Sequence, residues 1–90
     1  MGNYLGCIAF ERKNFNANRI ANGIANEIKQ SDTWGFRENI TKEAYNWLET
    51  NANPLATLVE RNLEGRYIVA ITRGKEYGEY HIQVEWYRVN

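Results

Sequence analysis

The chain has 90 residues, a length typical of one domain, and its 11 basic and 11 acidic side chains give a formal net charge of zero. This balance argues against a dedicated nucleic-acid binder, because neutralising a phosphate backbone requires a clustered surplus of positive charge. Hydrophobic residues make up 43% of the chain and aromatic residues 13%, which is enough for a small core and too much for a disordered chain. We therefore expect a single compact domain over residues 1–90.

The N-terminal third of the chain predicts a strand and then a helix. Residues 4–10 are apolar on both faces of an extended chain, which is typical of a strand covered on both sides. In residues 14–30, apolar side chains recur at helical spacing and predict an amphipathic helix. The opposite side of this helix carries a row of amides, which form either a solvated face or a polar recognition surface. The row consists of Asn18, Asn22 and Asn26.

Two large aromatic side chains mark the segment that follows this helix. We expect residues 31–38 to form a loop, with Trp34 and Phe36 on either side of Gly35. The two rings either pack on the core or stay exposed as anchors for a partner, since aromatic residues are common in binding hot spots. Thr41 is a favourable N-cap for a second helix that begins soon after this loop.

A proline divides the helical middle of the sequence. We expect the second helix to end at residues 51–53, because Asn53 and Pro54 have the order of an N-cap followed by the favoured first helical residue. A third helix then runs to Gly65, a natural stop signal. The residues expected to be buried together are Ile8, Ile20, Ile24, Leu48, Leu58, Ile71, Ile82 and Val84.

The C-terminal quarter predicts a β-hairpin, with strands over residues 66–73 and 79–89 and a turn over residues 74–78. The second strand alternates between apolar and polar residues, so one face meets the core and the other meets water or a partner. The predicted order is therefore β-α-α-α-β-β. This order indicates an α+β fold, in which a three-stranded, mainly antiparallel sheet carries the helices on one face.

Cysteine content and hydropathy indicate the compartment. The single cysteine, Cys7, excludes an intrachain disulfide, whereas secreted domains of this size usually carry several. The sequence also lacks a signal-peptide pattern and any run near the roughly 20 apolar residues that cross a membrane. We therefore expect a cytoplasmic protein without a membrane partner, in which Cys7 is buried and unreactive.

The sequence offers no recognisable catalytic, cofactor-binding or metal-binding constellation. The only histidine, His81, has Glu79 and Glu85 as its acidic neighbours on one strand face, which is a poor ligand set for a metal. Acid–base chemistry at His81 is less favoured than a plain surface role. Residues 74–78 lack the Lys-Ser/Thr ending of a phosphate-binding loop. We expect no enzymatic activity and no cofactor.

What remains favours a small non-enzymatic protein that binds another protein, as a regulator or inhibitor of the kind that phages and mobile elements encode. The expected partner-binding residues are Arg73, Lys75, Tyr77, Glu79, His81, Gln83 and Glu85. The alternative partner-binding residues are Asn18, Asn22, Asn26, Trp34 and Phe36. Two other functions stay open. One is a homodimer, and the other is a nucleic-acid-binding or RNA-cleaving, toxin-like protein that uses the basic and aromatic groups of the C-terminal hairpin.

Overall fold

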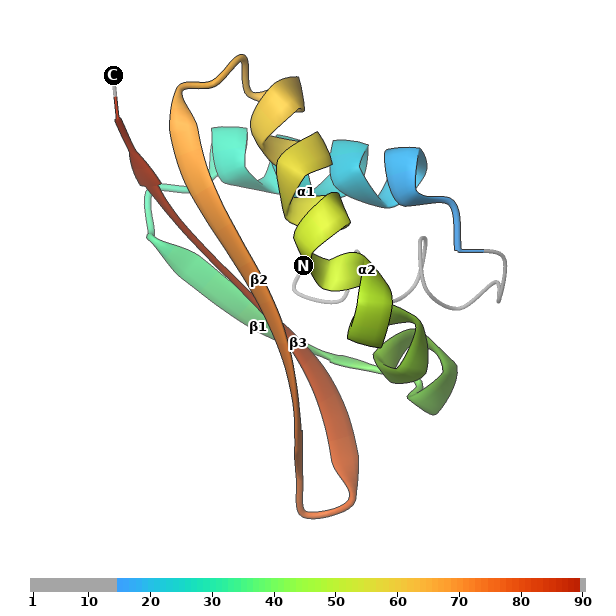
Figure 1. Ribbon diagram of the computed structural model, residues 1–90. Helices are drawn as coiled ribbons and strands as arrows, with labels where there is room; N and C mark the ends of the chain where they lie inside the picture. Colours follow the sequence, from blue (N-terminus) through green and yellow to red (C-terminus); the bar gives the residue numbers. More distant parts are fainter. Residues whose placement is uncertain (1–14, 90) are drawn as a thin grey trace.

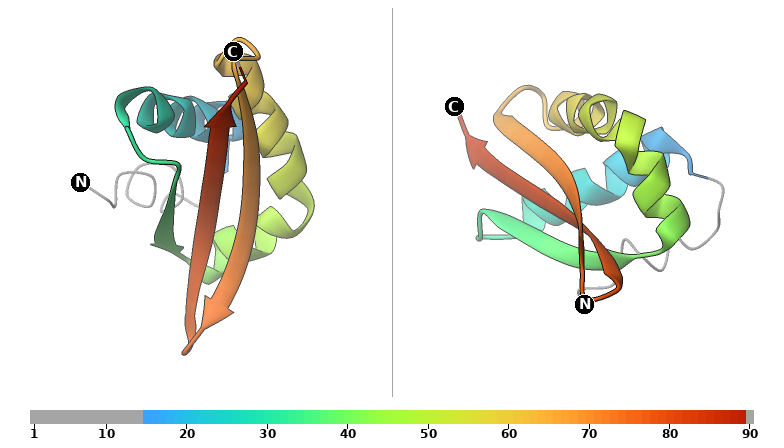
Figure 2. Two further views of the ribbon diagram at one scale, coloured as in Figure 1. Left: turned by 90° about the vertical axis from the view of Figure 1, so that its left-hand side faces the viewer. Right: turned by 60° about the horizontal axis from the view of Figure 1, so that its bottom comes forward.

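The computed structural model describes residues 15–89 as two helices and three strands (Figure 1). In chain order, these are α1 (Ala17–Gln30), β1 (Gly35–Ile40), α2 (Lys42–Asn62), β2 (Tyr67–Glu76) and β3 (Glu79–Arg88). The strands form one antiparallel sheet in the order β1-β3-β2. Both helices lie on the same side of this sheet (Figure 2). The predicted α+β class, with helices on one face of a three-stranded antiparallel sheet, is confirmed, but the predicted order β-α-α-α-β-β is not: residues 15–89 have the order α-β-α-β-β, and the strand that joins the C-terminal hairpin in their sheet is β1. The predicted strand at residues 4–10, with Cys7 and Ile8, lies outside the described residues.

Helix α1 follows the pattern that the sequence predicts. The Asn16 side chain caps it by accepting a hydrogen bond from the Arg19 backbone N–H (3.0 Å), so the helix begins at Ala17 rather than at residue 14. One stripe of the helix is buried and packs against α2 and the sheet. This stripe consists of Ile20, Ala21, Ile24, Ala25 and Ile28.

The predicted loop over residues 31–38 is wrong in its second half, because β1 begins at Gly35. The strand pairs with β3 from Gly35↔Glu85 to Ile40↔Tyr80. Its sequence gives little local strand signal, since a glycine and three polar residues interrupt the apolar alternation. Pairing with the long β3 strand therefore determines its conformation, which is a tertiary effect that overrides local propensity.

Helix α2 is continuous from Lys42 to Asn62, so the predicted division into two helices at residues 51–53 is wrong. Pro54 lies inside the helix, where the missing N–H and the ring cost about 3 kcal/mol. The apolar stripe stays in phase on both sides of Pro54, and burying it as one surface offsets that cost. The buried stripe consists of Ala44, Leu48, Leu55, Ala56 and Val59.

The structure differs from the prediction at one core residue, Leu58, and at the end of α2. Leu58 is only partly buried, because the stripe runs through Leu55 and Val59 on either side of it. The helix ends two residues before Glu64 and Gly65, which both have positive φ (61° and 72°) and turn the chain toward β2. The other predicted core residues within 15–89 are buried, and they meet in one cluster.

The hairpin turn is tighter than the sequence predicts. Only Tyr77 and Gly78 connect the strands, and both have positive φ (52° and 79°), as a type I′ turn requires. Gly74 therefore belongs to β2 and not to the turn. A methyl group at Gly74 would overlap the imidazole of His81, its cross-strand partner, so the missing side chain lets that ring lie against the strand.

Candidate interaction surface

The face of the sheet that points away from the helices is open to solvent. In Figure 2 (left) the strands lie in front of both helices. Because side chains alternate along a strand, the register assigns every second residue to this face. We call it the outer sheet face, and it comprises Gly35, Arg37, Asn39, Ile68, Ala70, Thr72, Gly74, Glu76, Glu79, His81, Gln83, Glu85 and Tyr87.

A chain of polar contacts crosses the outer sheet face from strand to strand. The Arg37 guanidinium lies 3.4 Å from the Glu76 carboxylate and donates to Gln83 Oε1 at 3.2 Å. Gln83 Nε2 in turn donates to Glu85 Oε2 at 2.7 Å. Exposed contacts of this kind stabilise the fold by less than about 1 kcal/mol each. Their main effect is to hold Arg37, Gln83 and Glu85 in one arrangement.

One end of this polar chain borders a shallow pocket of about 210 Å³. Its most exposed wall is Trp34, whose residue surface is 70% accessible. The Trp34 carbonyl accepts from the Trp86 N–H at 2.9 Å, so its backbone is fixed although its ring is not covered. A Cβ at Gly35 would lie 2.8 Å from the Val84 carbonyl oxygen and 3.3 Å from Glu85 Cγ. Only glycine therefore permits this close approach between β1 and β3.

Further exposed apolar side chains lie on the outer sheet face and at the hairpin tip beside it. Ile68 and Tyr87 lie opposite each other in the β2–β3 register, and both are exposed. At the hairpin tip, Tyr77 is completely exposed. Large aromatic side chains that remain in water are typical of surfaces that bind proteins.

The structure divides the predicted hairpin residues between the two faces of the sheet. Four of them lie on the outer sheet face: Glu79, His81, Gln83 and Glu85. Arg73 lies on the helix side, where it donates to the Tyr45 carbonyl at 2.9 Å and its guanidinium stands 4.1 Å from the Tyr45 ring centroid. The ring centroids of Tyr45 and Tyr80 are 4.8 Å apart, and the Lys75 ammonium lies 5.3 Å from the Tyr80 ring centroid. Arg73 therefore joins the hairpin to α2, whereas Lys75 contacts a ring of the hairpin itself.

The alternative residues are also divided. All three asparagines are exposed, but Asn22 Oδ1 accepts from Asn62 Nδ2 at 2.8 Å and so connects α1 to α2. Phe36 is partly buried, with its ring 5.9 Å from that of Trp86 in an edge-on arrangement. Trp34 alone of the two loop aromatics is available to a partner.

The charge of the outer sheet face is negative. It carries one basic side chain, Arg37, and three acidic ones, Glu76, Glu79 and Glu85, for a sum of −2. Residues 15–89 contain no group of three metal-ligating side chains. Neither helix in that range is both long and apolar enough to cross a membrane.

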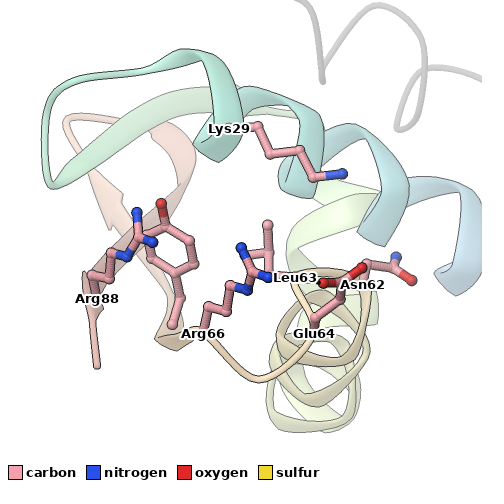
Figure 3. A pocket seen from close by; sticks show the side chains of 7 residues that line it. Lys29, Asn62, Leu63, Glu64, Arg66 and Arg88 are labelled. Carbon is pink, nitrogen blue, oxygen red and sulfur yellow. Dashed lines mark ion pairs between the residues drawn. The ribbon is translucent and has the colours of Figure 1, made fainter. Parts of the chain in front are cut away.

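Sequence reasoning missed a second pocket of about 270 Å³, at the end of the sheet remote from the hairpin turn (Figure 3). It joins residues that come from the end of α1, the end of α2, and the facing ends of β2 and β3. No local pattern connects such residues, since their spacing in the sequence reaches 59 positions from Lys29 to Arg88. We call it the helix-end pocket, and it is lined by Lys29, Asn62, Leu63, Glu64, Arg66, Tyr67 and Arg88.

Comparisons with protein-family models, with curated proteins and with solved structures find no match to this chain.

Proposed function

We propose that this chain is a non-enzymatic protein that binds another protein through its outer sheet face. The observation that carries the proposal is the exposed side chain of Trp34, which lines the shallow pocket at the edge of the outer sheet face together with Glu85, whose carboxylate accepts a hydrogen bond from Gln83. An exposed aromatic anchor next to an oriented polar group is the usual composition of a binding hot spot. The ordered side chains lose little conformational entropy on binding, and this favours affinity.

The charge of the outer sheet face favours a partner with basic side chains. A Lys or Arg of the partner would meet both the Glu85 carboxylate and the Trp34 ring, which attract cations by charge and by the ring quadrupole. The same charge disfavours the nucleic-acid alternative. Arg73, Lys75 and Arg88, the cations on which that alternative depends, each lie near a tyrosine ring on the helix side of the sheet.

We assign to this binding protein the role of a regulator or inhibitor that acts in a reducing cytoplasm. Small proteins of this kind are encoded by phages and mobile elements. A preformed face on a small rigid sheet suits a protein that acts by covering a site on its partner. This role needs no chemistry from the outer sheet face itself. It rests on the single cysteine and on the absence of a recognisable catalytic pattern in the sequence.

The experiment is a comparison of captured proteins between matched variants. Immobilised wild-type protein, the double variant Trp34→Ala/Glu85→Arg and the double variant Asn18→Lys/Asn26→Lys are each incubated with cell lysate. We expect a partner that the wild type and the asparagine variant capture equally and the first variant loses. Loss in the asparagine variant instead assigns binding to α1. Capture that nuclease treatment abolishes would replace this proposal with the nucleic-acid alternative. A concentration-dependent dimer with no other partner would replace it with the homodimer alternative.

A further inference from the structure

The helix-end pocket concentrates positive charge in a chain whose net charge is zero. Three of its lining residues are basic, Lys29, Arg66 and Arg88, and one is acidic, Glu64, which gives a local sum of +2. Like charges held together repel one another unless an anion or solvent screens them. In Figure 3 the three basic side chains border the pocket, and they come from the end of α1, the connection between α2 and β2, and the end of β3.

We propose that the helix-end pocket binds a small phosphate dianion, either free phosphate or a compact phosphomonoester. Arginine and lysine are the side chains that recognise phosphate oxygens, the former through paired N–H groups. The volume of about 270 Å³ is below the range for drug-sized ligands and fits a compact anion. This site is independent of the proposed function, because it lies away from the outer sheet face.

The ion pair between Arg66 and Glu64 leaves donors on Arg66 for a ligand. The Arg66 Nη2 atom stands 3.7 Å from the Glu64 carboxylate, beyond ordinary hydrogen-bond distance. Both side chains are more than half exposed, so this contact is weak. Lys29 takes part in neither of the two ion pairs that the structure has among residues 15–89.

The backbone around the pocket is fixed without a ligand. The Arg66 N–H donates to Leu63 O at 3.1 Å, and its carbonyl accepts from the Val89 N–H at 2.9 Å. Leu63 is almost fully buried and forms an apolar base. The guanidinium of Arg88 lies 5.9 Å from the ring centroid of Tyr67, which places it over the pocket wall. An anion therefore meets a site whose supports are already in position.

A competing explanation is that the cations only complement the negative ends of the helix dipoles, because Lys29 lies in the last turn of α1. Arg61 distinguishes the two explanations. It lies in the last turn of α2 and so shares any dipole role, but it does not line the pocket.

The test measures phosphate binding by calorimetry and by the rise in melting temperature, at constant ionic strength adjusted with chloride. We expect saturable binding to the wild type. The variant Lys29→Gln/Arg66→Gln should lose about tenfold or more in affinity, since two charge-assisted contacts disappear. Arg61→Gln should stay within about twofold, and Glu64→Gln should bind about twofold to threefold more tightly because a competing carboxylate is removed.

A measurement on the wild type alone tests the proposal even if one variant unfolds. In the wild type, phosphate should shift the backbone amide NMR signals of Gly65 and Arg66 along a saturation curve. Tighter binding of glycerol phosphate than of phosphate identifies an ester as the natural ligand, and the reverse order identifies free phosphate. Equal stabilisation of all variants by phosphate, or a chloride effect equal to that of phosphate at the same ionic strength, would overturn the proposal, because screening alone then explains the result.

Discussion

At the scale of single residues, two leucines one turn apart in α2 have different surroundings. Leu55 is completely buried, whereas Leu58 is only partly so. We expect Leu55→Ala to lower the free energy of unfolding by about 2–5 kcal/mol and Leu58→Ala by distinctly less, because a half-open site leaves a smaller cavity. Denaturant unfolding of both variants measures the difference. Equal losses would mean that the inward stripe of α2 is wrongly placed.

Two glycines of the sheet form a second matched pair. Alanine at Gly35 would press its methyl group against the Val84 backbone carbonyl, which is part of the sheet and cannot move away. Alanine at Gly74 would meet only the far end of the His81 ring, which can rotate. We expect Gly35→Ala to cost about 1–3 kcal/mol, as overpacking does, and Gly74→Ala to cost less. Thermal melts of the two variants test this order, which a rigid His81 would reverse.

At the scale of elements, the sequence predicts most of the secondary structure where a local pattern is strong. The alternation of β3 and the stripe of α1 each appear within a few residues, and both elements form as predicted. Two elements, β1 and α2, differ from the prediction, for opposite reasons. β1 has almost no pattern of its own and forms because β3 pairs with it, whereas Pro54 is a strong local stop signal that the continuous stripe of α2 overrides.

Pro54 gives a test of this explanation. If α2 is one helix strained by its proline, Pro54→Ala restores a backbone hydrogen bond and should raise the free energy of unfolding by about 1–3 kcal/mol. If Pro54 instead begins a separate helix, it occupies its favoured position and its removal should destabilise the protein. Circular dichroism during urea unfolding reports both the helix content and the sign of the change.

At the scale of the whole molecule, the sequence predicts which residues lie on each face of β3, but it does not predict on which face of the sheet the residues of the adjacent strands lie. Arg73 and Lys75 lie near Glu79 and Glu85 in the chain, yet they project to the other side of the sheet. The outer sheet face therefore carries a net negative charge rather than a mixed one. Trp34 lines the shallow pocket at the edge of this face only because β1 pairs beside β3, which no pattern within residues 31–40 indicates.

The most direct test of binding through the outer sheet face is a titration of the captured partner into three proteins. These are the wild type, Trp34→Ala/Glu85→Arg, and the control Asn18→Lys/Asn26→Lys on exposed positions of α1. We predict that the first double variant loses about 100-fold or more in affinity, as expected when two hot-spot side chains are lost, and that the control stays within about twofold. Unchanged affinity in the first variant, with its fold intact by circular dichroism, would contradict the proposed role of the outer sheet face.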